Sequence, residues 1–182
     1  MPIQHINNRI LSLMQRGHTS EGTINLLRKI KNELPDVALR TTFIVGFPGE
    51  TDEEFNELVK FVQEFEFDRV GVFTYSPEEG TTAFKLEDSV PEEVKQQRLE
   101  KIMEVQQAIS LKLNTKKIGK TLKTIIDRKE GGYFIGRTEF DSPEVDNEVI
   151  IDASENKLQI GQFYPILINR VEDFDLYGTV SH

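Results

Sequence analysis

Two periods of hydrophobic and polar residues divide the chain. Up to about residue 117, short apolar runs that favour strands alternate with segments whose apolar residues recur every three or four positions, which favours helices. Strands are predicted at residues 2–5, 41–45 and 69–75, with helices between them and a long helix over residues 92–117. This order is typical of an α/β parallel sheet or βα (TIM-type) barrel. Because a closed barrel needs roughly 200 residues or more, the sequence predicts only its second half, cut from a longer protein.

From Lys120 onward the hydrophobic period changes to two, which is typical of strands. Five short strands are predicted in some 60 residues, and this favours a small five-stranded antiparallel barrel of the OB-like kind. The expected domains are therefore the half barrel, residues 1–91, a linker helix, residues 92–117, and an all-β domain, residues 118–182. The five strands are expected near Leu122–Asp127, Tyr133–Thr138, Glu148–Ile151, Pro165–Val171 and Leu176–Val180.

The turn G-F-P-G-E, residues 46–50, joins a predicted strand to a predicted helix. Its two glycines allow a sharp turn and a close approach of the backbone to a ligand. Thr51 and Glu54 have the spacing of a capping box at the start of the helix. Small molecules bind at such turns in α/β proteins, but glycine-rich turns also occur where nothing binds. Both interpretations stay open from this stretch alone.

Composition and charge exclude several classes of protein. The 182 residues include no cysteine and three histidines, so disulfides, thiolate-bound zinc and cysteine-held iron–sulfur clusters are excluded within the chain. No apolar run has the length of a membrane span and no signal peptide is recognisable, so the cytoplasm is expected. The net charge is −9. Residues 118–182 hold 7 basic and 12 acidic side chains, a net charge of −5 that repels nucleic acid and attracts basic partners.

Several motifs in order resemble the radical S-adenosylmethionine methylthiotransferase family. They are P-I-Q-H at the start, F-I-V-G-F-P-G-E-T followed by D-E-E-F, R-V-G-V-F-T-Y-S-P-E-E-G-T-T-A, and Q-R-L in the predicted linker helix. The last domain resembles the TRAM domain that closes these enzymes, with G-R-T and D-L-Y-G in the expected places. The resemblance covers essentially the whole chain.

The resemblance implies S-adenosylmethionine and two 4Fe-4S clusters in the full-length enzyme. One cluster cleaves S-adenosylmethionine to a radical that abstracts hydrogen from an unactivated carbon, and the methylthio group arrives by way of the other. The family binds these clusters through cysteines, and this chain has none. The chain is therefore expected to lack both cluster domains, to hold no metal or cofactor, and to be catalytically inactive alone.

Ten residues match positions that the family places around the cofactor. The resemblance implies strand-end contacts to adenine, ribose and carboxylate, with the aromatic residues stacking on adenine or packing in the core. For the arginine among them, a salt bridge at the start of its strand is an equally good interpretation. The cofactor-binding residues expected are Gln4, Arg40, Ile44, Gly46, Phe47, Gly49, Glu50, Phe73, Tyr75 and Ser76.

The segment E-F-D-S-P-E-V-D-N-E-V, residues 139–149, resembles the RimO-type branch, which methylthiolates an aspartate β-carbon of the small-subunit ribosomal protein S-twelve. An acidic surface suits a basic ribosomal protein, and a solvated acidic loop without a partner is the alternative interpretation. The alternatives are a fragment of a tRNA-modifying methylthiotransferase whose TRAM domain binds tRNA, and a stand-alone binding module. Self-association through the open edges of the half barrel is also expected. The substrate-binding residues expected are Glu139, Asp141, Glu144, Asp146 and Glu148.

Overall fold

The computed structural model describes residues 1–87, 89–143, 146–154 and 157–181. The chain folds into two compact units, residues 1–106 and 107–182, and the division falls inside its longest helix. The sequence-based division into three parts, with boundaries after residues 91 and 117, stays a prediction. Among the residues that are described, no helix has the length and apolar character needed to cross a membrane.

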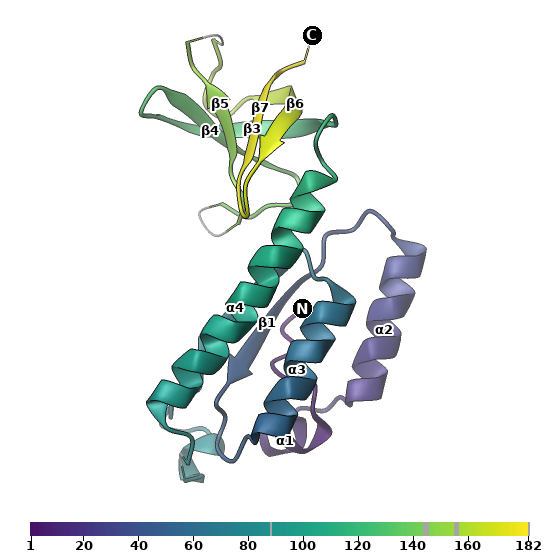
Figure 1. Cartoon of the computed structure of the whole chain (residues 1–182), viewed down its shortest axis with the longest axis vertical. Helices are drawn as coiled ribbons and strands as arrows, with labels where there is room; N and C mark the ends of the chain where they lie inside the picture. The colour runs from purple at the N-terminus through teal and green to yellow at the C-terminus, as the bar shows by residue number, and fades with distance from the viewer. Residues whose placement is uncertain (88, 144–145, 155–156, 182) are drawn as a thin grey trace. The chain divides into compact units, whose positions relative to one another are not determined.

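The first unit places helices around a small parallel sheet (Figure 1). Strand β1 (Arg40–Val45) pairs in parallel with β2 (Arg69–Thr74), with Arg40 opposite Arg69 and Val45 opposite Thr74. Its helices are α1 (Asn8–Leu13), α2 (Ser20–Glu33), α3 (Asp52–Phe65), the 3-10 turn η1 (Ala83–Lys85) and the first turns of α4 (Glu92–Thr115).

Helix α3 begins and packs as its sequence requires. Thr51 Oγ1 accepts from the Glu54 N–H while the Glu54 side chain accepts from the Thr51 N–H, so the capping box is formed. The apolar stripe of α3 is buried and includes Phe61, whose ring lies edge-on to that of Phe43 at 6.2 Å between centroids. Phe43 points to the opposite side of β1 from Ile44, so the other face of the strand is left for the candidate site.

Residues 2–5 form less of a strand than the sequence predicts. Gln4 makes one isolated parallel bridge to Phe43, in which its N–H donates to the Thr42 carbonyl and its carbonyl accepts from the Ile44 N–H. The segment continues no further because Gln4 has φ 73°, outside the extended conformation. The described part of the first unit thus holds a two-stranded sheet and one bridge, and the half TIM barrel remains an interpretation.

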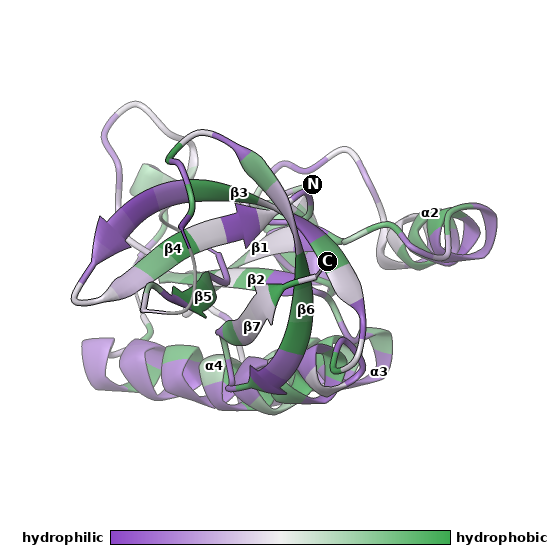
Figure 2. Ribbon diagram, turned by 90° about the horizontal axis from the view of Figure 1, so that it is seen from above, coloured by the Kyte–Doolittle hydropathy of each residue, from purple (hydrophilic) through white to green (hydrophobic). Residues whose placement is uncertain are grey.

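The second unit is a closed five-stranded barrel (Figure 2). The strands follow the order β3-β4-β5-β7-β6 around the ring, and β6 closes it by pairing with β3. All pairs are antiparallel except β5–β7, so the expectation of a wholly antiparallel barrel is wrong at that pair. The reason is geometric, because five strands around a closed ring cannot alternate in direction at every step. The strands are β3 (Thr121–Glu130), β4 (Tyr133–Thr138), β5 (Val149–Asp152), β6 (Phe163–Val171) and β7 (Leu176–Val180).

Two glycines let the barrel close tightly. A Cβ atom at Gly136 would lie 2.3 Å from the Ile125 carbonyl oxygen, and one at Gly178 would lie 2.5 Å from that of Leu167. Both glycines belong to the motifs G-R-T and D-L-Y-G noted in the sequence, so those motifs have a packing reason in the barrel. The core inside is made of aliphatic and aromatic residues, among them Ile126, Phe134, Val149, Ile151, Ile166, Ile168 and Leu176.

Candidate functional site

The turn after β1 is held from inside by a buried carboxylate. Gly46 and Gly49 have φ of 70° and 77°, a left-handed conformation that favours glycine. Glu50 turns back beneath them, and its Oε2 accepts from the N–H groups of Gly46 at 3.0 Å and Phe47 at 3.3 Å. Glu50 is only 4% exposed. Its carboxylate therefore stabilises the turn from below.

The surroundings of Glu50 decide its protonation. Arg98 Nη1 donates to Glu50 Oε1 at 2.9 Å, and the buried His5 Nε2 lies 3.7 Å from Oε2. Burial raises the pKa of Glu50 from 4.5 to about 7, against the opposing effects of Arg98 and the two backbone donors. Burial also lowers the pKa of His5 from 6.5 to about 4. His5 is therefore neutral near pH 7, with Nδ1 accepting from the Asn7 N–H.

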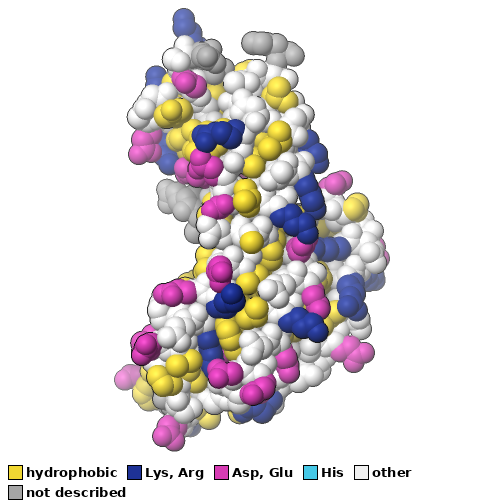
Figure 3. All heavy atoms as spheres, viewed as in Figure 1, with side chains coloured by type: hydrophobic (Ala, Val, Ile, Leu, Met, Phe, Trp, Pro, Cys, Tyr) yellow, Lys and Arg dark blue, Asp and Glu magenta, His cyan; other side chains and the backbone are white. Residues whose placement is uncertain are grey.

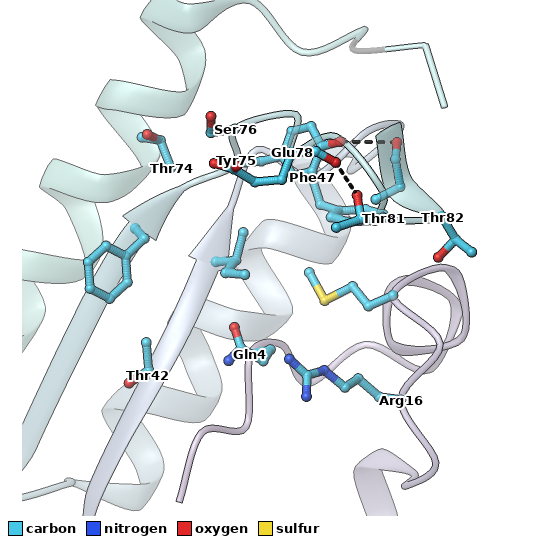
Figure 4. Close-up of a pocket in the computed structure, with 14 residues that line it drawn as sticks. Gln4, Arg16, Thr42, Phe47, Thr74, Tyr75, Ser76, Glu78, Thr81 and Thr82 are labelled. Atoms are coloured by element: carbon cyan, nitrogen blue, oxygen red, sulfur yellow. Dashed lines mark hydrogen bonds between the residues drawn. The ribbon is translucent and has the colours of Figure 1, made fainter. Parts of the chain in front are cut away.

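A cavity of about 500 Å³ opens on the face of the sheet opposite α3 (Figure 4). The rings of Phe47 and Tyr75 form one wall, with centroids 5.1 Å apart and planes at 70°. Gln4 and Arg16 lie at the other end of the cavity, and the Arg16 guanidinium points toward Gln4. The wall is mainly apolar, with a few polar groups, as in small-molecule sites.

Six of the ten expected cofactor residues line this cavity. They come from the bridge, the C-terminal half of β1 and the end of β2, and are Gln4, Ile44, Phe47, Phe73, Tyr75 and Ser76. Gly46, Gly49 and Glu50 form the turn beside it and are not among the lining residues. Arg40 lies at the opposite end of β1 from the turn, some five residues or roughly 16 Å away along the strand.

Eight residues of the cavity wall, Thr74 of β2 among them, are not among the ten expected from the sequence. Met14 and Arg16 follow α1, where Gln15 has φ 55° and turns the chain sharply. Thr42 of β1 shares the inward face with Ile44, and this position could have been found from the alternation of side chains along a strand. The remaining part is the loop after β2, where Tyr75 Oη donates to the Ala83 carbonyl at 3.0 Å; its lining residues are Glu78, Thr81, Thr82 and Ala83.

The neighbour of Gly46 is a side chain of α4. A Cβ atom at Gly46 would lie 2.2 Å from Lys95 Cγ, so the glycine is required by the close approach of this lysine. A close approach of the backbone to a ligand is therefore not needed to explain this glycine. Gly49 is different, because a Cβ there would meet nothing closer than Arg9 Nη1 at 3.8 Å.

Two features of the cavity are compatible with the adenosyl and amino-acid parts of S-adenosylmethionine, the cofactor that the resemblance implies. Gln4 Oε1 is a buried acceptor without a partner among the described residues, so a ligand hydroxyl or ammonium group could satisfy it. The aromatic wall offers a stacking surface. The chain does not fit an iron–sulfur cluster, because it has no cysteine. Among the residues that are described, no group of three or more histidine, aspartate or glutamate residues could hold a metal ion.

The acidic segment of the barrel is less free than its sequence suggests. Asp141 is buried and accepts from Thr138 Oγ1 at 2.5 Å, and Glu148 is paired with Arg128 at 2.7 Å. Asp146 is half-buried and accepts from the Ser142 N–H at 2.8 Å, whereas Glu139 is exposed. Glu144 lies outside the described residues. On the face seen in Figure 3, acidic and basic side chains are interspersed.

Comparison with known proteins gives a consistent result for both units. Residues 1–62 match the Radical SAM superfamily, and residues 118–180 match the TRAM domain. The relatives of this chain include three that carry the name ribosomal protein uS12 methylthiotransferase RimO. Those of Christiangramia forsetii and Flavobacterium psychrophilum are 54% identical over 98% of this chain and 40% and 41% of their own length; that of Bacteroides thetaiotaomicron is 52% identical over 98% and 41%.

The chain spans about two fifths of the length of the curated relatives it matches. One solved structure, the archaeal Methanocaldococcus infernus Elp3 with an N-terminal deletion, aligns with 94% of this chain and 51% of its own. Its TM-score is 0.39 at 14% identity, too low to support an argument about the fold.

Proposed function

We propose that this chain, which belongs to the radical S-adenosylmethionine methylthiotransferase family, forms the cofactor-facing half barrel and the TRAM domain of an enzyme that methylthiolates ribosomal protein uS12. The modified atom in this proposal is the β-carbon of an aspartate. The observation that carries it is the meeting of the family's strand-end residues, far apart in the sequence, at one cavity of about 500 Å³. The proposed substrate is ribosomal, so the expected cytoplasmic location belongs to the same proposal.

The chain's own residues would bind and orient the cofactor. Phe47 and Tyr75 would hold the adenine, and Gln4 Oε1 would accept from a ribose hydroxyl or the ammonium group. Arg16 points into the cavity and would pair with the carboxylate, whereas the expected cofactor residue Arg40 lies at the far end of β1. S-adenosylmethionine supplies, on reductive cleavage, the radical that removes hydrogen from an unactivated carbon. The two clusters of the proposal would need ligands from outside these residues.

The barrel is proposed to dock the substrate protein through its acidic charge. Residues 118–182 have a net charge of −5, from 7 basic and 12 acidic side chains, which favours a basic partner. Glu139 is exposed and would contribute most to the attraction of a basic partner. Asp146 is half-buried and would contribute less. Asp141 and Glu148 would act by shaping the segment, because both are engaged within the barrel.

One observation favours tRNA as the second candidate partner. Lys123 Nζ lies 4.7 Å from the ring centroid of Phe163, which is 57% exposed. A cation beside an exposed aromatic ring is typical of surfaces on which bases stack. This pair belongs to an acidic unit, so we expect it to support a much weaker complex with tRNA than the acidic segment supports with a basic protein.

A binding experiment on the 182-residue chain separates the two candidates. Purified uS12 and tRNA are titrated in parallel at physiological salt, with Glu139→Lys as the test variant. Glu33→Lys, the same charge change on the exposed end of α2, is the matched control. Binding of uS12 that is weakened by Glu139→Lys and not by Glu33→Lys supports the proposal. Tight binding of tRNA alone would move the assignment to the tRNA-modifying branch.

A further inference from the structure

Helix α4 buries two cations beside the candidate site. Lys95 and Arg98 lie one helical turn apart and are 3% and 6% exposed. Burying a cation is costly unless it is paired, and apolar residues of similar size would pack at lower cost. Neither cation lines the cavity. The cost of burying these two cations therefore indicates that they have a role in the geometry of the site.

Arg98 holds the turn that follows β1. Its Nη1 donates to Glu50 Oε1 at 2.9 Å and to the Glu50 carbonyl at 3.2 Å, and its Nη2 pairs with Asp52 Oδ1 at 2.7 Å. The carboxylate so fixed accepts from the N–H groups of Gly46 and Phe47. Two hydrogen-bonding steps thus connect α4 with Phe47, whose ring is a wall of the cavity.

Lys95 holds the end of β2. Its Nζ donates to the Tyr75 carbonyl at 3.3 Å and lies 5.6 Å from the centre of the Tyr75 ring. The aliphatic part of the same side chain packs against Gly46. Lys95 therefore contacts the ends of both strands, which carry the two aromatic walls of the cavity.

We propose that Lys95 and Arg98 are positioning residues that set the spacing of the two strand ends and so the shape of the cofactor cavity. They act through Glu50, Gly46 and Tyr75 and touch no ligand. We call the contacts of Lys95 and Arg98 with the two strand ends the clamp. The inference rests on the proposed function for what the cavity binds, but the geometry of the clamp does not depend on the ligand. It gives the Q-R-L motif of the sequence a defined task, because Arg98 is its central residue.

The first test uses the 182-residue chain and needs no ligand. Backbone amide exchange is measured for Lys95→Met, Arg98→Met and Arg98→Lys. The control is Lys101→Met, which removes an exposed cation of the same helix and its ion pair with Glu104. We expect exchange at Gly46 and Phe47 to rise by at least about tenfold in the two methionine variants at Lys95 and Arg98. Exchange in residues 121–138 should not change, and Lys101→Met should behave as the wild type.

The second test uses the full-length methylthiotransferase that contains this chain. Lys95→Met and Arg98→Met should raise the KM for S-adenosylmethionine by about tenfold or more, with kcat and the KM for the protein substrate within about twofold of the wild type. Arg98→Lys should recover part of the lost affinity, because one of the two ion pairs can still form. General destabilisation would instead lower the concentration of active enzyme and the apparent kcat, without a selective rise in the KM for S-adenosylmethionine.

The outcomes separate this inference from the function on which it rests. A wild-type enzyme without S-adenosylmethionine-dependent transfer would overturn the proposed function, while the exchange experiment would still decide whether the clamp exists. An active enzyme whose Lys95 and Arg98 variants match Lys101→Met in amide exchange and in KM would overturn the clamp. Should Arg98→Met fail to fold, Lys95→Met and Arg98→Lys give the same decision.

Discussion

The side chain of Lys95 occupies the space that a Cβ atom at Gly46 would need. The separation would be 2.2 Å to Cγ and 3.0 Å to Lys95 Cβ, well inside van der Waals contact. Gly46 also has φ 70°, which a residue with a Cβ rarely adopts. The glycine is therefore fixed by two independent constraints, one from its own backbone and one from a residue 49 positions later in the chain.

Gly46→Ala should destabilise the first unit, and Lys95→Ala should relieve part of that loss. We expect a cost of about 3 kcal/mol for Gly46→Ala, of which roughly 1–2 kcal/mol reflects the left-handed backbone and the rest overpacking against Lys95. In the Lys95→Ala background the cost of the same change should fall to about 1–2 kcal/mol. Urea unfolding of the four proteins in a double-mutant cycle measures this. Equal costs in both backgrounds would show that Lys95 does not constrain Gly46.

His5 and Glu50 should give opposite and largely cancelling pH dependences. The pKa of Glu50 is raised from 4.5 to about 7, so the folded state loses stability as the pH rises through that window. The pKa of His5 is lowered from 6.5 to about 4, so the folded state gains stability as the pH rises from 4 to 6.5. Each contribution is on the order of 3 kcal/mol, and the two oppose each other between pH 4.5 and 6.5.

Two single substitutions separate these contributions. Relative to the wild type, Glu50→Gln should become more stable as the pH rises from 4.5 to 7, because only the wild type loses stability when Glu50 ionises in the unfolded chain and not in the folded one. His5→Asn should become less stable over pH 4 to 6.5, because the gain from neutral His5 is absent. Denaturant unfolding between pH 4 and 7 checks both, with the exposed Glu64→Gln as control. If stability varies with pH in the two variants as it does in the wild type, the opposing contributions of Glu50 and His5 are contradicted.

The 182-residue chain should be inactive alone and should bind S-adenosylmethionine negligibly. The cysteines that hold a cluster are absent, and the described sheet has two strands, so much of the wall around a bound cofactor is missing. Calorimetry with S-adenosylmethionine, and an assay for methylthio transfer with a reductant, are the measurements. Micromolar affinity for S-adenosylmethionine, or any methylthio transfer by this chain, would contradict the prediction.

The chain should also associate with itself through β2. Within the described residues β2 pairs with β1 only, so its other edge has no neighbouring strand, and Phe73 of β2 is 61% exposed. We expect a dimer at high concentration by light scattering, and Phe73→Lys should shift the chain to a monomer by replacing an exposed apolar side chain of this strand with a charge. The exposed Lys60→Glu change on α3 is a control that should leave the dimer intact. A wild-type chain that stays monomeric would overturn the prediction.

The sequence by itself determined the local structure and part of the site. The capping box of Thr51 and Glu54, the alternation of β1 and the glycines of the turn after it depend on residues close in the chain, so their pattern was readable. Family resemblance marked ten residues for one site, and six of them line one cavity. The aromatic wall was among them because Phe47 lies two residues after one predicted strand and Tyr75 is the last residue of another.

Tertiary structure decided what depends on residues far apart. The inward turn of Glu50 toward Arg98, the contact of Lys95 with Gly46 and the place of Arg16 in the cavity join positions separated by up to about 50 residues or brought together only by a left-handed turn at Gln15. No local pattern encodes the contacts of Arg98 with Glu50 and of Lys95 with Gly46, since they arise when α4 packs against the strand ends. The parallel pair β5–β7 is likewise a property of closure, because five strands in a ring cannot all alternate.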